Sequence, residues 1–405
     1  MKIKRATYYC NAYMYYLILL LCNITFSLAD QQEIMPLEQR ADSLSDEGRT
    51  FFSAYRYEEA IHAFKQALST EVALGRIGEI ASRLHNIGEA YYERCVFDSA
   101  LFYLDSALVL AREARKEILV CQILNKISEN QEILGHYNKA LTYYDSALTL
   151  ARKVEDRYTE GVVLCNIGWA YDALSDYERA LLYHDSARVV ARAISNLKLE
   201  GHILRRIGTA YSVLSQYDRA LAYYDSALTI ARAVGDRKLE GRTLMGIGRV
   251  HFALLQYDET LDVNRTALDI MRAIGDRFGE AYVLDCSGMA YRYLCQYEEA
   301  LAHHKDALAI RRDIQDEPGE GNALVNIGLT YDSYYKYEKA LAYLDSALII
   351  AKTIRNKTVC AIIFISAGAI YDQLARYDQA LAYYDSALAT VRETKEKMQE
   401  VAIIM

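Results

Sequence analysis

The sequence has 405 residues, of which 52% are hydrophobic and 25% are charged, and it contains only 2 prolines. This composition is typical of a folded helical protein and excludes a disordered or fibrous chain. The 46 Lys and Arg residues against 54 Asp and Glu residues give a formal net charge of -8. Such a balance argues against a nucleic-acid surface, where an excess of basic residues is expected.

The first predicted element is an apolar segment at the N-terminus. Basic residues near the start precede an uncharged stretch, residues 6–29, which ends in Ser27-Leu28-Ala29. We interpret residues 1–29 as a signal peptide cleaved near Ala29, so we expect an exported protein, either periplasmic or secreted. The stretch is also long enough to span a membrane at ~20 residues per crossing. The alternative is therefore a protein anchored by residues 6–29, and contact with a membrane is expected only through that uncleaved segment.

A 40-residue repeat follows a short lead-in, residues 30–40, and runs from residue 41 to 398 without insertion or deletion. In the clearest copy, residues 201–240, apolar side chains recur at helical spacing in two stretches, which predicts a helical hairpin. Identical hairpins with short connections stack into a superhelix with a concave face. We therefore predict an all-α solenoid of about nine antiparallel helix pairs. Residues 399–405 are either a C-terminal stub or the start of a tenth repeat.

Small and aromatic positions of the repeat predict how its helices pack. Gly208 recurs at the same position in every other unit except one, where Ser128 replaces it. A glycine inside a helix costs roughly 1 kcal/mol relative to alanine, so its recurrence indicates a close approach of the two helices, with Ala220 as the opposing small residue. Tyr217 is expected to fill the turn between the helices and to keep its hydroxyl in water.

Helix ends carry a second recurring pattern. Gly235 is expected to cap the second helix, and Arg237 with Glu240 at i, i+3 opens the next first helix. An arginine or lysine also recurs near the end of each second helix, from Arg112 to Arg392. We expect this cation to offset the negative end of the helix dipole.

The pattern Leu-x-x-Ile-Gly-x-x-Tyr, followed by aromatic-x-x-Ala and Ala-Leu, resembles the tetratricopeptide repeat (TPR). The resemblance covers about 360 of the 405 residues. The unit is similar to the longer variety found in kinesin light chains, the Pins spindle adaptor and many bacterial scaffold proteins. Leu204 and its equivalents stand where the family often has tryptophan, and no proline closes the second helix. The resemblance implies a right-handed superhelix that binds peptides or proteins along its concave groove, without catalysis.

Two functions remain open on these grounds. The first is a free-standing exported scaffold or adaptor that binds proteins or acidic peptide segments, with no cofactor and no small-molecule substrate. The alternative is the ligand-binding sensor module of a larger signalling or effector protein whose output domain is absent from this chain. The apolar residues 403–405, at the start of a possible tenth unit, motivate this alternative because terminal repeats normally carry a polar outer face.

We predict neither an enzyme nor a metal site. His303 and His304, with Cys295 nearby, lack the spacing of tetrahedral metal ligands, and His304 replaces a tyrosine that packs in other units. The recurring aspartate of Asp-Ser-Ala, as at Asp225, follows the outer helices one per unit. Catalytic carboxylates would have to converge on one cleft, so we interpret this series as a solvated stripe.

The candidate binding residues lie on the first helix of each unit, which lines the groove in this repeat type. The second and third units place glutamates there, Glu89, Glu93, Glu129 and Glu132, whereas the fifth to seventh units place arginines. In Pins-like relatives, inward arginines and asparagines bind extended acidic peptides. We therefore expect an acidic segment to bind here with Trp169 as an apolar anchor. The predicted peptide-binding residues are Asn166, Trp169, His202, Arg205, Arg206, Arg242, Arg249 and Arg292.

Overall fold

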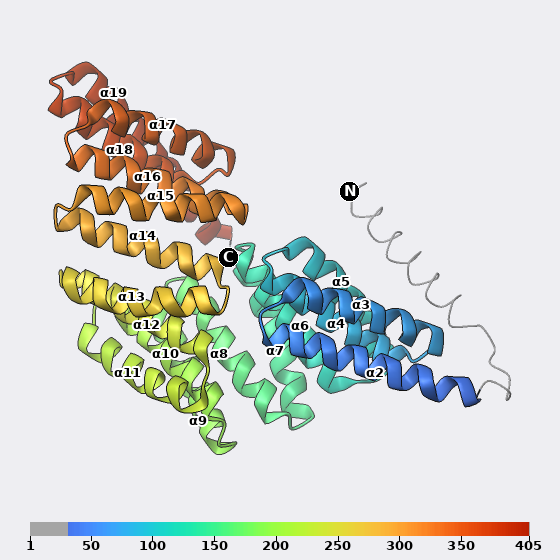
Figure 1. Ribbon diagram of the computed structural model, residues 1–405. Helices are drawn as coiled ribbons and strands as arrows, with labels where there is room; N and C mark the ends of the chain where they lie inside the picture. The colour runs from blue at the N-terminus through green and yellow to red at the C-terminus, as the bar shows by residue number, and fades with distance from the viewer. Residues whose placement is uncertain (1–30, 405) are drawn as a thin grey trace. The chain divides into compact units, whose positions relative to one another are not determined.

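The computed structural model describes residues 31–404, and these residues form a succession of α-helices (Figure 1). The predicted signal peptide, residues 1–29, lies outside them. The helices are α2 (Gln31–Ser53), α3 (Tyr57–Leu74), α4 (Ile77–Glu93), α5 (Phe97–Glu113), α6 (Glu117–Ile133), α7 (Tyr137–Lys153), α8 (Arg157–Ala173), α9 (Tyr177–Ala193), α10 (Leu197–Val213), α11 (Tyr217–Val234), α12 (Arg237–Ala253), α13 (Tyr257–Ala273), α14 (Arg277–Tyr293), α15 (Tyr297–Asp313), α16 (Glu317–Ser333), α17 (Tyr337–Thr353), α18 (Lys357–Gln373) and α19 (Tyr377–Ile404).

Both ends of the described chain continue helices of the repeat. Helix α2 begins at Gln31, so nearly all of the lead-in that we delimited as residues 30–40 belongs to the first helix. Helix α19 runs to Ile404, so the stub that we delimited as residues 399–405 extends the last second helix through that residue.

The helices divide into two compact units, which we describe separately. Unit 1 is residues 1–216 and contains α2–α10, and unit 2 is residues 217–405 and contains α11–α19. Even-numbered helices are the first helices of the repeat, and odd-numbered helices are the second. Within each unit the first helices also contact one another, as α4 contacts α6 in unit 1 and α12 contacts α14 in unit 2. The predicted all-α solenoid of stacked helix pairs is therefore confirmed.

Each connection between described helices turns through one residue in the left-handed region. Glycine occupies this position at four connections, including the predicted caps Gly235 (φ 70) and Gly275 (φ 69). Residues with a side chain occupy it at the other thirteen connections, as Leu255 does with φ 62. Because left-handed backbone costs such a residue about 1–2 kcal/mol, most turns are held by the packing of the helices around them.

The recurring glycine lies where two helices of a pair approach closely, as predicted. A Cβ atom at Gly168 would lie 3.0 Å from the carbonyl oxygen of Ala180, and one at Gly328 would lie 3.3 Å from that of Ala340. Both alanines are fully buried. At position 128, the serine that replaces this glycine is buried and donates to the carbonyl oxygen of Leu124.

The recurring arginine of the second helix forms an ion pair with the next first helix. Arg152 Nε donates to Glu160 Oε1 at 2.9 Å, and Glu160 is almost fully buried. The same contact joins Arg192 to Glu200, Arg232 to Glu240, Arg272 to Glu280, and Arg312 to Glu320, at 2.6–3.0 Å. We call this contact the interhelix clamp. At these five interfaces the arginine does more than offset a helix dipole, because it ties one helix pair to the next.

Six first helices also begin with a side-chain cap. The carboxylate of Asp156, for example, accepts a hydrogen bond from the backbone N–H of Thr159 at 3.0 Å. The helices capped in this way by Asp or Asn are α8, α10, α12, α14, α16 and α18. Helices α4 and α6 differ, because Arg76 and Lys116 precede them and make no such bond.

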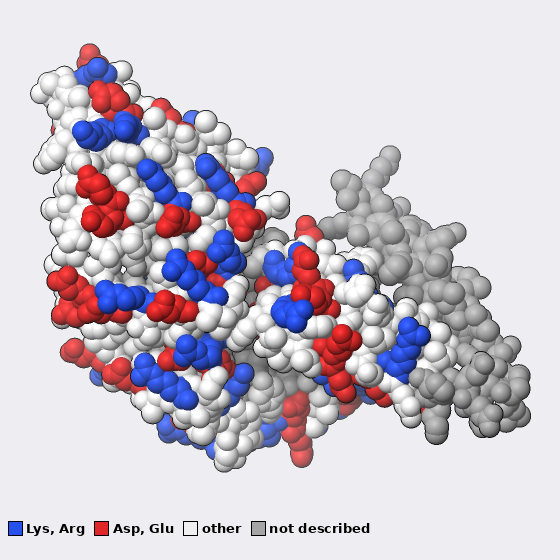
Figure 2. Space-filling view, in the orientation of Figure 1, with Lys and Arg blue, Asp and Glu red and all other residues white. Residues whose placement is uncertain are grey.

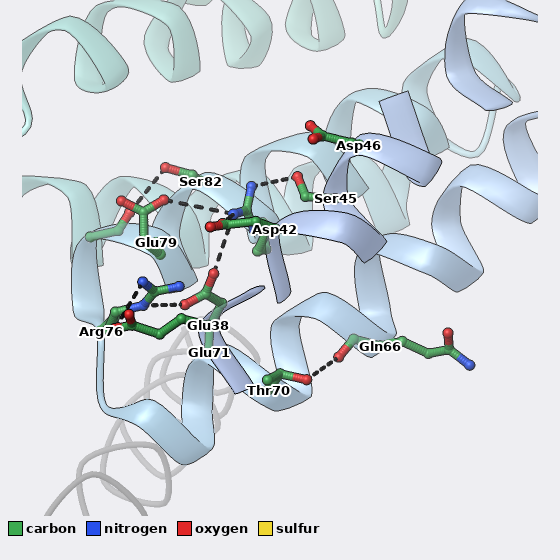
Figure 3. A network of polar contacts seen from close by, with 12 residues as sticks. Glu38, Asp42, Ser45, Asp46, Gln66, Thr70, Glu71, Arg76, Glu79 and Ser82 are labelled. Carbon is green, nitrogen blue, oxygen red and sulfur yellow. Dashed lines mark hydrogen bonds and ion pairs between the residues drawn. The ribbon is translucent and has the colours of Figure 1, made fainter. Parts of the chain in front are cut away.

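A buried polar network joins α2, α3 and α4 in unit 1 (Figure 3). Arg83 Nη2 lies 3.2 Å from Glu71 Oε1, and Arg83 Nη1 donates to the Ser45 hydroxyl at 2.6 Å. Arg76 Nε donates to the second oxygen of Glu71 at 2.7 Å. At the equivalent positions, most other units have an aliphatic residue in place of Arg83 and alanine in place of Glu71. An ion pair thus replaces an apolar contact at this interface.

Candidate peptide-binding faces

The candidate binding residues lie on the first helices, so each unit has its own first-helix face. In unit 1, α8 carries Asn166 and Trp169, and α10 carries His202, Arg205 and Arg206. All five side chains are half-buried. The guanidinium carbon of Arg206 lies 3.9 Å from the centre of the Trp169 ring. One face of the predicted apolar anchor is therefore covered by a predicted carboxylate-binding arginine.

Asn166 takes part in a polar cluster that we did not predict. Its amide nitrogen donates to Asn125 Oδ1 at 3.0 Å and to Glu129 Oε1 at 2.9 Å. Lys126 Nζ lies 2.7 Å from Glu129 Oε2 and 4.8 Å from the centre of the Tyr92 ring. The spacing of Lys126 and Glu129 on one helix, and the 40-residue interval from Lys126 to Asn166, were the sequence signals for this cluster.

Glu132 changes the charge of the unit 1 face. It is 6% exposed, and it accepts a hydrogen bond from the Tyr144 hydroxyl at 2.8 Å. Burial raises the pKa of Glu132 from its ordinary value of 4.5 to about 8, although Tyr144 and Arg206 act in the opposite direction. This carboxyl group is therefore mostly protonated at neutral pH. With Lys126 paired to Glu129, the unit 1 face is less acidic than the sequence alone suggested.

In unit 2, Arg249 on α12 lies beside Tyr224, Tyr282 and Cys286. Burial alone would lower the pKa of Arg249, but Tyr224 and Tyr282 raise it, so the guanidinium stays charged in a partly apolar surrounding. Burial also raises the pKa of the Cys286 thiol to about 12, which keeps that neighbour neutral. Arg249 is thus a permanent positive charge on this face.

The other two predicted residues of unit 2 differ in their partners. Arg242 is exposed and lies 3.8 Å from a carboxylate oxygen of Asp276. Arg292 lies with its guanidinium carbon 4.8 Å from the centre of the Tyr293 ring. Neither Arg249 nor Arg292 takes part in an ion pair among residues 37–393, whose side chains the structure describes. Arg249 is hydrogen-bonded to Tyr224 and Tyr282, and Arg292 acts electrostatically on Asp332.

The described residues contain no cluster of three or more His, Cys, Asp and Glu side chains that could hold a metal ion. His304 is fully buried and its Nδ1 lies 3.1 Å from Asp285, so it packs like the tyrosines of other units. Acidic and basic side chains are interspersed on the surface of both units in the view of Figure 2. Over the same stretch, no helix combines the length and apolar character needed to cross a membrane.

Comparison of the whole chain with solved structures shows the same fold in three proteins. A signal transduction ATPase with a tetratricopeptide repeat sensor, from Pyrococcus horikoshii, is 17% identical with a TM-score of 0.61. The match covers 86% of this chain and 54% of that one, so this chain spans about half of the ATPase. The apo quorum sensor NprR from B. thuringiensis is 16% identical with a TM-score of 0.61, and the match covers 90% and 99% of the two chains. A Rap protein complexed with competence and sporulation factor is 13% identical with a TM-score of 0.60, covering 88% and 99%.

Comparison by sequence assigns the family. Curated proteins give no match to this chain. One model of the tetratricopeptide repeat matches residues 119–193, 200–273 and 279–353, and a second matches residues 364–398. These ranges cover more than half of the chain and coincide with the helix pairs described above. The chain therefore belongs to the tetratricopeptide repeat family.

Proposed function

We propose that this protein is an interaction scaffold that binds extended segments of other proteins on its first-helix faces. The observation that carries the proposal is the pair Arg249 and Arg292 in unit 2, two half-buried first-helix arginines that take part in no ion pair among residues 37–393, whose side chains the structure describes. Tetratricopeptide repeat domains are interaction modules, and two proteins of the same fold support this reading: NprR is a quorum sensor, and the Rap protein was solved in complex with competence and sporulation factor.

The bound segment is acidic. A carboxylate that reaches Arg249 or Arg292 gains charge-assisted hydrogen bonds, each worth roughly 1.5–3 kcal/mol. Tyr282 and Tyr293 border the same arginines and offer apolar area for neighbouring side chains. In unit 1, Asn166, Trp169 and Arg206 are held by one another and by α6, so this face supports the segment through shape and stacking more than through free charge.

The scaffold has no catalytic activity of its own in this proposal. The recurring aspartates, such as Asp225 and Asp345, lie at most one per repeat on exposed positions of the second helices and do not converge. Binding without catalysis requires only that the first-helix faces keep their shape, and the interhelix clamps and the helix packing hold that shape. Partner binding without any measurable hydrolase or transferase activity in the purified chain is the expected behaviour, and an intrinsic turnover that survives purification would contradict it.

The second candidate is a sensor module within a larger signalling protein. The similarity to the ATPase with a tetratricopeptide repeat sensor favours it, since the match takes in 86% of this chain but only 54% of that protein. Continued reading frame downstream of residue 405 in the encoding DNA would support this candidate over a free-standing scaffold.

Export is a further part of the proposal. Residues 1–29 carry the signal-peptide pattern, so the mature protein is expected to begin near Asp30 and to reach the periplasm or the medium. N-terminal sequencing of the protein isolated from its own cells tests this. An intact Met1 on exported material would instead support the anchor formed by residues 6–29.

Capture of partners from the native host tests the scaffold proposal. Three full-length baits are compared: the wild type, the double variant Arg249→Gln with Arg292→Gln, and the matched control Arg265→Ala, whose arginine is exposed on the second helix α13. Proteins that bind the wild type and the control but not the double variant support the first-helix face of unit 2. Partners retained equally by all three baits would place binding on another surface.

A further inference from the structure

A large open cavity lies within unit 1, between α5, α6 and α7. Its volume is ≈ 1170 Å³, which is ample for a small organic ligand, since such sites usually enclose about 300–1,000 Å³. The lining contains three cationic side chains, one carboxylate (Glu117), several aliphatic side chains and a few neutral polar ones. The lining residues that matter are Arg112, Arg115, Lys116, Ile118, Leu150 and Val154.

The cavity occurs where the interhelix clamp is incomplete. Arg112 occupies the position of the clamp arginine, but Val120 stands where Glu160 and its equivalents supply the buried carboxylate. Helix α6 also lacks the aspartate or asparagine cap of later first helices, because Lys116 occupies that position. Two acidic or polar acceptors found at the neighbouring α7–α8 interface are therefore replaced here by an aliphatic and a basic residue.

The remaining charges around the cavity are unequally paired. Lys116 Nζ lies 2.7 Å from Glu79, and Lys153 Nζ lies 2.8 Å from Glu117, so these four groups neutralise one another. Arg112 and Arg115 form no ion pair with any of residues 37–393, the part of the chain with described side chains. The cavity thus presents two unneutralised guanidinium groups beside a hydrophobic wall.

We propose that this cavity binds a small monocarboxylate with an apolar chain. The ligand's carboxylate takes the place of the missing glutamate and accepts hydrogen bonds from Arg112. The other five clamps show that an arginine at this position holds a carboxylate with N–O distances of 2.6–3.0 Å. The apolar chain covers Ile118, which is 52% exposed, and contacts Leu150 and Val154. The ligand is bound and not converted, and the site is separate from the first-helix face of unit 2.

Isothermal titration of the full-length chain with decanoate tests the proposal. Decanoate is expected to bind the wild type with one site per chain, and Arg112→Ala is expected to weaken binding about tenfold or more. Val120→Glu restores the clamp with a carboxylate from the chain itself, so it is expected to abolish decanoate binding without lowering the melting temperature. Arg152→Ala is the matched control, because its clamp already contains Glu160, and it is expected to bind decanoate as the wild type does.

Two further probes separate the charge from the chain. Acetate, which has the carboxylate alone, and decanol, which has the chain alone, are both expected to bind more weakly than decanoate. The proposal is overturned if the wild type does not bind decanoate, or if Arg112→Ala and Val120→Glu bind it unchanged. Displacement of decanoate by a captured protein partner would also overturn it, because the cavity would then belong to a protein interface. The decanoate proposal does not depend on the scaffold proposal. If the unit 2 arginine variants did not affect partner binding, the decanoate measurements would still stand.

Discussion

The guanidinium of Arg83 lies 3.2 Å from the carboxylate of Glu71, and both side chains are buried at the interface of the first two repeats. Arg83→Ala removes one of the two arginines that pair with Glu71 and leaves Arg76 as its partner, so it is expected to lower the free energy of unfolding by about 1.5–3 kcal/mol. The double variant Glu71→Ala with Arg83→Ile installs apolar residues that other repeats have at these positions. It is expected to be as stable as the wild type or more stable. Urea denaturation checks both variants, and a double variant as unstable as Arg83→Ala would refute this expectation.

The interhelix clamp predicts a difference between two glutamates in unit 2. Glu280 is 6% exposed and accepts bonds from Arg272 at 2.9 Å and Arg277 at 2.6 Å. Both arginines regain water when the carboxylate is removed, so Glu280→Ala is expected to cost about 1–2 kcal/mol of unfolding free energy. The exposed Glu259→Ala is the control and is expected to change stability by under ~0.5 kcal/mol. Equal losses in the two variants would show that the clamp does not stabilise the stack.

The turn at Leu255 offers a stabilising substitution. Leu255 has φ 62 and is 70% exposed, so its side chain strains the backbone and contributes little packing. Leu255→Gly relieves a cost of about 1–2 kcal/mol and adds some entropy to the unfolded chain, for an expected net gain of about 0.5–1 kcal/mol. Leu182→Gly, also exposed but inside helix α9, is expected to lose about 1 kcal/mol. Thermal denaturation measures both, and a lower melting temperature for Leu255→Gly would contradict the reasoning.

Glu132 predicts a pH dependence of stability. Burial raises its pKa in the folded protein to about 8, and in the unfolded chain it ionises near its ordinary value of 4.5. Between these two pH values the folded state holds a proton that the unfolded state releases, so stability falls as pH rises through this window. Glu132→Gln removes this contribution while keeping an acceptor for Tyr144. Its melting temperature relative to the wild type is expected to increase from pH 5 to pH 8, and parallel curves would rule out the raised pKa.

The fold could be predicted because its determinants are local and repeated. The spacing of apolar residues, the glycine at Gly168 and its equivalents, and the caps at Gly235 and Gly275 each recur with a 40-residue interval. Contacts between repeats were harder to predict, because they depend on which side chains of two helices face each other. The bond from Arg152 to Glu160 and the pair of Arg83 with Glu71 are of this kind.

The candidate site was predictable as a set of positions but not as a set of contacts. The repeat interval places Asn166, Arg206 and Arg249 on first helices. It does not show that Asn166 is held by Glu129, nor that Arg206 stacks on Trp169. Those contacts arise from neighbouring first helices within unit 1, and they are visible only once the packing of the helices is known.

The proposal that an acidic segment binds at Arg249 and Arg292 predicts that its affinity falls when these charges are removed or when salt is added. The most direct test is the dissociation constant of the segment identified by capture, measured for the wild type, for Arg249→Gln with Arg292→Gln, and for the control Arg265→Ala. Loss of two charge-assisted contacts is expected to weaken binding at least ~100-fold, while the control binds as the wild type does, and added salt weakens the wild-type complex. An unchanged dissociation constant in a folded double variant would contradict binding at the first-helix face of unit 2.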